Sequence, residues 1–357
     1  VRPEFSVPEG GLNIRLMDTP QAQELRIIDY KRHAVQAFAR ANRMDKRVLG
    51  QSGAKIGFVA AGKNWLDLEH AMQVLGMDHE AAIRHGVTTY KVAMTWPLDV
   101  ESFSEWSKGL KIIVVVEEKR KLIELQIKEA LFNHKSGLQV LGAKNSTGGV
   151  LFPDSYALDP LVIAEKIGTI LVKNNCGSER LDAAMKRIQD AQQANNAPTL
   201  ASRLPYFCSG CPHNSSTKVP EGSRAYAGIG CHYMVQWMDR ETLGFTQMGG
   251  EGANWIGESL FSSRKHVFQN IGDGTYNHSG IQAIRAAVAA GTTITYKILF
   301  NDAVAMTGGQ KNDGGLNAAR IVAEVRGIGV RDLAVIYDEK EDVSNKDFPK
   351  DVICLPR

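Results

Sequence analysis

The sequence predicts an α/β protein built from two parallel-sheet domains. Apolar, strand-like runs alternate with amphipathic helical segments between residues 55 and 132, and the same alternation returns from residue 266 to residue 337. Such alternation is typical of parallel strands joined by helical crossovers. A chain of 357 residues also has room for about two domains, each large enough to bury its own core.

The elements are expected in a definite order. A loop rich in Pro and Gly opens the chain, and the apolar spacing then predicts a linking helix over residues 22–42. The first α/β region is expected to contain strand 56–60, helix 66–75, strand 87–94, strand 112–116 and helix 121–132. The second is expected to contain strand 266–271, helix 280–290, strand 293–300, helix 316–326 and strand 332–337.

The stretch between these regions has little strand signal, is punctuated by Gly and Pro, and ends in a polar helix over residues 179–195. It predicts an interdomain connection. The expected organisation is therefore an arm and linking helix over 1–47, a first α/β domain over 48–135, a connection over 136–200 and a second α/β domain over 201–357.

Composition narrows the class of protein. The chain has 42 Lys and Arg against 39 Asp and Glu, without a basic block interleaved with aromatics, so no nucleic-acid partner is expected. No apolar run approaches the ~18–20 residues that span a bilayer, so no membrane association is expected. Five unevenly spaced cysteines favour a reducing compartment, which predicts the cytoplasm. Because the chain starts at Val1 and stops at Arg357, we expect a piece of a longer polypeptide.

Polar residues follow two neighbouring strands of the second region. Asp273 lies within Gly272-Asp273-Gly274, directly after strand 266–271, and Asn301 follows the next predicted strand. Open α/β sheets bind ligands at the carboxyl ends of their strands, so we expect these side chains to meet there. The glycines allow a phosphate to approach the backbone, and the carboxylate then requires a cation. Asp273, Asn301 and a backbone carbonyl near Ala303 predict a Mg²⁺ site.

A Gly-Asp-Gly tripeptide alone also makes an ordinary turn. Two further glycine-rich segments, 249–252 and 307–310, are expected either to shape a cofactor cleft or to be plain loops. The residues predicted to line the cofactor are Gly249, Gly250, Glu251, Gly252, Gly272, Asp273, Gly274, Thr275, Asn277, Asn301, Ala303, Thr307 and Gly308.

Three cysteines in the second region are candidate metal ligands. Cys208 and Cys211 form a Cys-x-x-Cys pair followed by proline, and Cys231 comes twenty residues later. This spacing suits an iron–sulfur cluster. A structural zinc site with His213 or His232 as fourth ligand is the alternative. An iron–sulfur cluster can accept electrons, whereas a zinc ion cannot. A cluster is therefore favoured if the neighbouring phosphate site holds a cofactor that forms a carbanion.

Five motifs together resemble the thiamine-diphosphate-binding domain of indolepyruvate:ferredoxin oxidoreductases, a family of 2-oxoacid:ferredoxin oxidoreductases. They are CSGCPHN, GIGCHYM, MGGEG-x-NWIG, NIGDGTYNHSG and ILFNDAVAMTGGQ. Upstream, GGLNIR and VVVEEKRKLIE resemble that family's middle domain, which is similar to the carboxyl-terminal domain of transketolases. The resemblance covers nearly the whole chain. One departure is Asp302, which stands where the family motif has a second asparagine.

The resemblance implies thiamine diphosphate, Mg²⁺ and a [4Fe-4S] cluster held by Cys208, Cys211 and Cys231, with Cys354 or a residue beyond this chain as fourth ligand. It implies oxidative decarboxylation of indolepyruvate or another arylpyruvate to an arylacetyl-coenzyme A, with electrons passed to ferredoxin. The glutamate that activates the cofactor is expected outside this chain, in a pyrimidine-binding domain. That domain and a small-subunit domain have no counterpart here, so we expect the chain alone to be inactive and the complete protein to be a homo-oligomer.

Two alternatives remain open on the residues alone. The same chemistry on another 2-oxo acid, such as pyruvate, would use the same motifs. A zinc-stabilised, non-catalytic module would use the cysteines structurally, with residues 272–274 as a plain turn. Glu117 and Glu118 follow an apolar strand, and for them we expect structural roles rather than acid–base chemistry.

Overall fold

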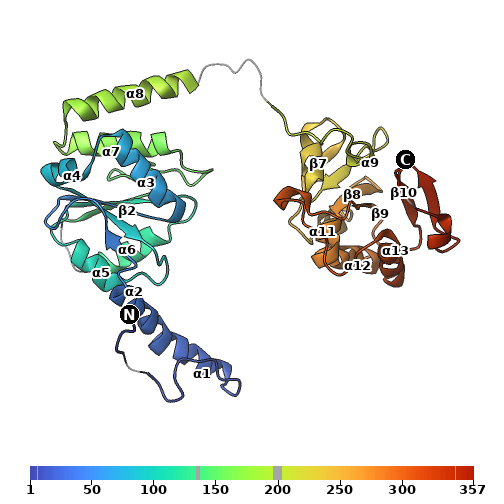
Figure 1. Cartoon of the computed structure of the whole chain (residues 1–357), viewed down its shortest axis with the longest axis horizontal. Helices are drawn as coiled ribbons and strands as arrows, with labels where there is room; N and C mark the ends of the chain where they lie inside the picture. Colours follow the sequence, from blue (N-terminus) through green and yellow to red (C-terminus); the bar gives the residue numbers. More distant parts are fainter. Residues whose placement is uncertain (6, 134–136, 196–202, 342) are drawn as a thin grey trace. The chain divides into compact units, whose positions relative to one another are not determined.

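The computed structural model describes every residue except 6, 134–136, 196–202 and 342. The chain divides into two compact units, unit 1 (Val1–Pro198) and unit 2 (Thr199–Arg357) (Figure 1). Two of the three boundaries expected from the sequence, 135/136 and 200/201, fall within segments that lie outside the described residues.

Unit 1 begins with the predicted linking helix. Helix α1 (Pro20–Leu25), the π-helical turn η1 (Arg26–Lys31) and helix α2 (Arg32–Ala41) follow one another directly. The hydroxyl of Thr19 accepts the Ala22 N–H and caps the first turn. The Arg40 guanidinium contacts the buried Asp99 carboxylate at 2.9 Å, which anchors the end of the helix to the domain.

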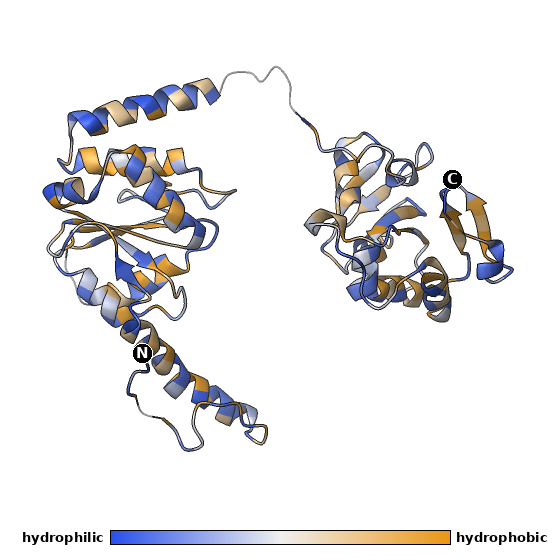
Figure 2. Ribbon diagram, viewed as in Figure 1, coloured by the Kyte–Doolittle hydropathy of each residue, from blue (hydrophilic) through white to orange (hydrophobic). Residues whose placement is uncertain are grey.

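The sheet of unit 1 is mainly parallel, as predicted. Strands β3 (Val87–Val92), β2 (Ile56–Ala61), β4 (Ile112–Val116) and β5 (Gln139–Leu141) lie side by side in that order. The short β1 (Lys46–Arg47) adds an antiparallel edge to β3. Residues of β2 and β4 are almost all buried because helices cover both faces. Figure 2 shows these strands in hydrophobic colours.

Two helical layers sandwich this sheet. Helices α3 (Gly62–Val74), α4 (His79–His85), α7 (Pro160–Lys173) and α8 (Glu179–Asn195) share one hydrophobic core with one face. Helices α5 (Val100–Trp106) and α6 (Ile123–Leu131) cover the other face. Figure 1 shows the two layers on opposite sides of β2.

The segment expected to be an interdomain connection differs from that expectation. Its described residues supply β5, α7 and α8, and the side chains of Phe152, Ile163 and Ile188 lie in the main core of unit 1. They are at most 2% exposed. The physical reason is that α7 is apolar on most of its surface and packs against both α3 and α8. The segment is therefore part of the first domain.

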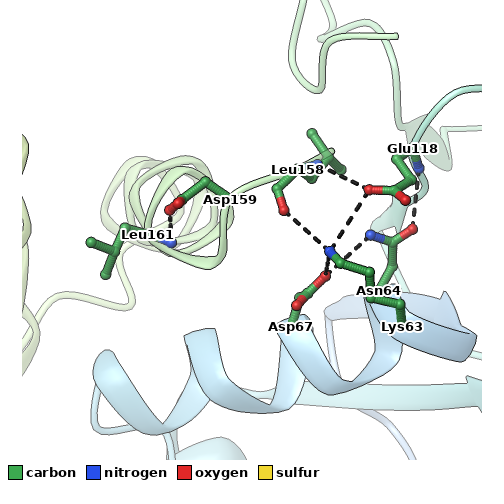
Figure 3. A network of polar contacts seen from close by, with 7 residues as sticks. All are labelled: Lys63, Asn64, Asp67, Glu118, Leu158, Asp159 and Leu161. Atoms are coloured by element: carbon green, nitrogen blue, oxygen red, sulfur yellow. Dashed lines mark hydrogen bonds and ion pairs between the residues drawn. The ribbon is translucent and has the colours of Figure 1, made fainter. Parts of the chain in front are cut away.

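A polar network fixes this segment to the sheet (Figure 3). Glu118, just after β4, accepts the Leu158 N–H at 2.9 Å. Lys63 of α3 pairs with Asp67 at 2.6 Å and donates to the Leu158 carbonyl at 3.4 Å. The Asp159 carboxylate caps α7 through the Leu161 N–H at 2.7 Å. Glu118 therefore has the structural role expected for it.

Unit 2 contains a four-stranded parallel sheet in the order β7-β6-β8-β9. Its strands are β6 (Ala225–Ala227), β7 (Thr242–Phe245), β8 (Val267–Gly272) and β9 (Ile294–Leu299). The helical elements around it are α9 (His213–Ser216), η2 (Cys231–Trp237), α10 (Ala253–Glu258), α11 (Asp273–Thr275), η3 (Tyr276–Gly280), α12 (Ile281–Ala289), η4 (Ala305–Thr307), α13 (Ala318–Gly327) and η5 (Asn345–Asp347).

The last predicted strand does not join this sheet. Strand β10 (Ala334–Tyr337) pairs in parallel with β11 (Ile353–Pro356) in a separate two-stranded sheet. A small cluster around Val322, Phe348 and Val352 packs this sheet against α13. Within the described parts of both units, every helix is too short or too polar to cross a membrane.

Candidate functional site at the carboxyl edge of the second sheet

The predicted meeting of Asp273 and Asn301 is present in the structure. Strand β8 pairs in parallel with β9, with Gly272 opposite Leu299, so the residues after both strands emerge at one edge. The Asn301 N–H donates to Asp273 Oδ2 at 3.0 Å. The Asn301 side-chain oxygen accepts the Ala303 N–H at 3.1 Å, which orders the start of the loop after β9. Three predicted Mg²⁺-site positions thus lie at one sheet edge.

Asp273 is 3% exposed, and three N–H groups orient its carboxylate. Gly274 N–H donates to Oδ1 at 2.8 Å, and Oδ2 accepts both the Asn301 N–H and the side-chain amide of Asn312 at 2.9 Å. Asn312 was not among the residues predicted from the sequence. These hydrogen bonds hold the Asp273 carboxylate in a fixed orientation, as expected of a Mg²⁺ ligand.

The glycine-rich segment 249–252 lies beside this edge. Gly249 has φ 86°, and a Cβ there would stand 2.5 Å from the Ser279 hydroxyl in η3, so both conformation and contact require glycine. The Glu251 side chain is fully buried and accepts the Gly249 N–H at 2.8 Å. Burial raises the pKa of Glu251. Gly250 and Gly252, the sequence neighbours of Glu251, are both buried.

The other predicted lining residues have varied positions. Thr275 is buried in α11, whereas the Asn277 amide donates to the Asp313 carbonyl at 3.0 Å and so holds a loop. Thr307 and Gly308 are exposed, and the Thr307 hydroxyl donates to the Gln310 side chain at 2.8 Å. The loop that contains them reaches the site through Val304, whose side chain would stand 2.9 Å from a Cβ at Gly274.

Two buried histidines that the sequence offered only as zinc ligands lie at the same edge. His232 is 2% exposed, and its Nδ1 accepts the Gly228 N–H at 3.1 Å. Burial lowers the pKa of His232 to about 4, with a smaller effect from His213. Burial also lowers the pKa of His213, and the Asp273 charge partly offsets that effect. Burial therefore favours the neutral form of both rings, and they lie close to residues Gly272-Asp273-Gly274, here called the phosphate-type loop.

The hydrogen bond from Gly228 bears on the zinc alternative. With Nδ1 occupied as an acceptor, the proton of the neutral ring is on Nε2. Neither nitrogen of His232 then has a free lone pair for a metal. His232 is consequently a poor fourth ligand in this conformation.

The three candidate cluster cysteines are neighbours, although they are not assembled as a ligand set. Cys208 is exposed, while Cys211 and Cys231 are partly buried. Burial raises the pKa of Cys231, and the Cys211 and Cys208 thiols add smaller effects of the same sign. Among the described residues, no three His, Cys, Asp or Glu side chains converge as a metal site. A cluster would have to draw these cysteines together.

Cys354 lies on β11, opposite Val335, and its side chain packs against the small apolar cluster around Phe348. Arg357, three residues later, donates to the Ser215 hydroxyl of α9 at 2.7 Å. The chain terminus therefore approaches the helix after Cys211, whereas the partly buried Cys354 side chain packs against an apolar cluster. This arrangement disfavours Cys354 as the fourth ligand.

Comparison with known proteins agrees with this geometry. Residues 228–343 match the model of the thiamine pyrophosphate enzyme C-terminal TPP-binding domain, a range that contains Asp273 and Asn301. Unit 2 thus has the cofactor-binding domain of a thiamine-diphosphate enzyme. Residues 46–195 match the indolepyruvate oxidoreductase domain, which includes the β5–α8 segment of unit 1. Over these two ranges the chain is similar to indolepyruvate oxidoreductases and to thiamine pyrophosphate enzymes.

Curated relatives extend the similarity across both units. The chain is 24% identical to the indolepyruvate oxidoreductase subunit IorA of Pyrococcus horikoshii over 82% of this chain and 46% of that protein. It is 26% identical to IorA of Methanothermobacter marburgensis over 75% of this chain and 41% of that protein. The chain therefore spans less than half the length of these relatives.

Among solved structures, a 2-oxoglutarate:ferredoxin oxidoreductase from Magnetococcus marinus matches at 16% identity. The match covers 42% of this chain and 23% of that one, with a TM-score of 0.26. A TM-score of this size supports no conclusion, so the fold assignment rests on the sheet topology and the family models.

Proposed function

We propose that this chain is the part of an indolepyruvate:ferredoxin oxidoreductase that binds the diphosphate of thiamine diphosphate through Mg²⁺. The observation that carries the proposal is the 3.0 Å hydrogen bond between the Asn301 N–H and Asp273 Oδ2. It joins the two strand ends within the region that matches the TPP-binding domain. A buried, oriented carboxylate beside an amide oxygen provides the hard oxygen ligands that Mg²⁺ prefers.

Asp273 would hold the cation, assisted by the Asn301 amide oxygen and the Ala303 backbone. Gly272 and Gly274 would leave room for the phosphates against the backbone. The loops around Gly249 and Val304 would border the site on two sides. Thiamine diphosphate, when bound, supplies the carbanion chemistry, whereas the protein provides position and electrostatics.

The electron path is proposed through Cys208, Cys211 and Cys231 as ligands of a [4Fe-4S] cluster. The Cys-x-x-Cys spacing and the proximity of Cys231 to Cys211 and Cys208 support this assignment. Cys231 directly precedes His232, whose Nε2 lies 3.7 Å from a Cβ built on Gly272, and this supports a cluster near the diphosphate site. The fourth ligand is proposed to come from outside the chain, because Cys354 packs into an apolar cluster.

The substrate is proposed to be an arylpyruvate such as indolepyruvate, with coenzyme A and ferredoxin as further partners. The names of the relatives support the substrate class. Because the chain spans under half of those relatives, the activating glutamate and the remaining domains are assigned to other parts of the complete protein.

The test is an anaerobic assay of viologen reduction by the complete gene product with thiamine diphosphate, Mg²⁺ and coenzyme A. Faster reduction with indolepyruvate than with pyruvate is the expected result. Reduction with pyruvate alone would transfer the same chemistry to another 2-oxo acid. Zinc in place of iron and sulfide, with no reduction by either acid, would overturn the proposal in favour of a zinc-stabilised module.

A further inference from the structure

The first glycine of the phosphate-type loop is unexplained by the protein itself. Gly272 has φ −74° and ψ 152°, a conformation that any residue adopts. A Cβ built on it would meet a single described heavy atom within 4 Å, His232 Nε2 at 3.7 Å. Neither backbone strain nor crowding therefore requires glycine at this position. The space beside Gly272 has room for a methyl group and is bordered by the His232 ring.

His232 presents a hydrogen-bond donor to that space. Its Nδ1 accepts the Gly228 N–H, so the neutral ring holds its proton on Nε2. Nε2 is buried and lacks a hydrogen-bond partner in the described part of the chain. A buried N–H without an acceptor is costly, so an acceptor is expected in the finished site.

A second buried polar side chain near Gly272 also lacks a hydrogen-bond partner, which supports a bound ligand at this place. Asn270 on β8 precedes Gly272 by two residues and therefore faces the same side of the sheet. It is fully buried, and within the described ranges neither atom of its amide has a partner. Gly228, in the loop between β6 and η2, packs against the buried Glu251, since a Cβ at Gly228 would stand 2.5 Å from Glu251 Cγ.

We infer that His232 is a ligand of the diphosphate, and that its Nε2–H donates to a phosphate oxygen lying over Gly272. This inference rests on the proposed function. Asp273 would bind the cation on one side of the diphosphate, and His232 would supply a neutral donor on the other. The ring donates as a neutral group, because its Nδ1 already accepts the Gly228 N–H.

The test is calorimetric titration of the complete gene product with thiamine diphosphate, and separately with inorganic pyrophosphate, at fixed Mg²⁺. His232→Leu removes the donor and is expected to weaken both ligands about tenfold or more. His232→Gln retains a donor and should recover part of the affinity. Gly272→Ala should weaken both ligands without lowering the unfolding midpoint, because the protein itself has room for the methyl group.

His266→Gln is the matched control, since His266 lies at the opposite end of β8 and contacts Thr295. Unchanged affinity in His232→Leu, with tight binding by the wild type, would overturn the role of His232 alone. Absence of Mg²⁺-dependent binding in the wild type would instead overturn the proposed function. Thermal unfolding of each variant separates loss of the ligand contact from loss of the fold.

Discussion

At the scale of single residues, the site depends on how Asp273 is oriented. Its link to Asn301 could be predicted, because two strand ends one crossover apart must meet in a parallel sheet. Its hydrogen bond from Asn312 could not be predicted, since Asn312 lies in the loop between η4 and α13, which has no periodic pattern. Asp302 adopts φ 54°, a left-handed conformation that Asn and Asp tolerate. Replacement of the family's asparagine by aspartate is therefore compatible with the backbone.

The cysteine assignments give a residue-scale prediction. Serine substitution of Cys208, Cys211 or Cys231 is expected to remove at least about half of the iron and labile sulfide after anaerobic reconstitution of the complete gene product. A thiolate ligand is lost in each case, whereas serine is a poor ligand for such a cluster. Iron and sulfide analysis measures the outcome.

Cys176→Ser is the matched control for these variants. Cys176 is buried in unit 1, where its thiol donates to the His85 carbonyl at 3.4 Å, and burial raises its pKa. Equal iron content in the control and in all three variants would contradict the assigned ligands.

At the scale of elements, the prediction succeeded where apolar residues repeat with one clear period. Helix α8 buries Leu181, Ala184 and Ile188, which share one helical face, and its predicted bounds agree with the structure. Helix α7 was not predicted, because Pro160 lies in the stretch whose Gly and Pro residues indicate a connection. In the structure it is the first helical residue, after the Asp159 cap.

Short elements were also missed. Strand β6 has three residues, too few for an alternating pattern to stand out. Gly142 was interpreted as part of a connection, yet a Cβ at that position would stand 2.6 Å from Glu124 Cδ in α6. Glycine is needed there for close packing, and one sequence alone cannot distinguish that need from a linker.

The integration of α7 into unit 1 can be tested by a cavity. Ile163→Ala is expected to lower the free energy of unfolding of unit 1 by about 2–4 kcal/mol, because Ile163 is fully buried in the main core. Denaturant unfolding measures the change. The control is Val172→Ala on the same helix, where Val172 is 45% exposed and the expected loss is small. Similar small losses in both variants would contradict integration.

The hydrogen bond between Glu118 and Leu158 predicts that the stability of unit 1 depends on pH. The Leu158 N–H and then the Lys63 charge lower the pKa of Glu118. Because the folded-state pKa lies below the unfolded value of about 4.3, the contact stabilises unit 1 above that pH and its effect disappears as pH falls. Glu118→Gln should therefore lower the free energy of unfolding of unit 1 by about 1 kcal/mol near pH 7, a value discounted for the partial exposure of Glu118.

Denaturant unfolding of the wild type and Glu118→Gln across pH measures this effect. The difference between them should close below about pH 4. The control is Glu129→Gln on the exposed side of α6, for which little change is expected at any pH. A difference that persists or widens in acid would contradict the assigned interaction.

At the scale of the whole molecule, two units provide different parts of the proposed enzyme. Unit 2 contains the sheet edge with Asp273 and Asn301 and the three candidate cysteines. Unit 1 is a sheet domain in which the polar network around Glu118 has a structural role. The isolated chain is therefore expected to give negligible viologen reduction with indolepyruvate under conditions in which the complete gene product reacts. Comparable rates per mole of protein would show that the activating groups lie within these residues.

The central claim is that Asp273 holds Mg²⁺ for the diphosphate of thiamine diphosphate. Its most direct test is calorimetric titration of the complete gene product with thiamine diphosphate, with Mg²⁺ or excess chelator, for the wild type and Asp273→Asn. We expect Mg²⁺-dependent binding that weakens about a hundredfold or more in Asp273→Asn, while the unfolding midpoint stays near the wild-type value. Equal binding by the wild type and Asp273→Asn, or binding unaffected by chelator, would contradict it.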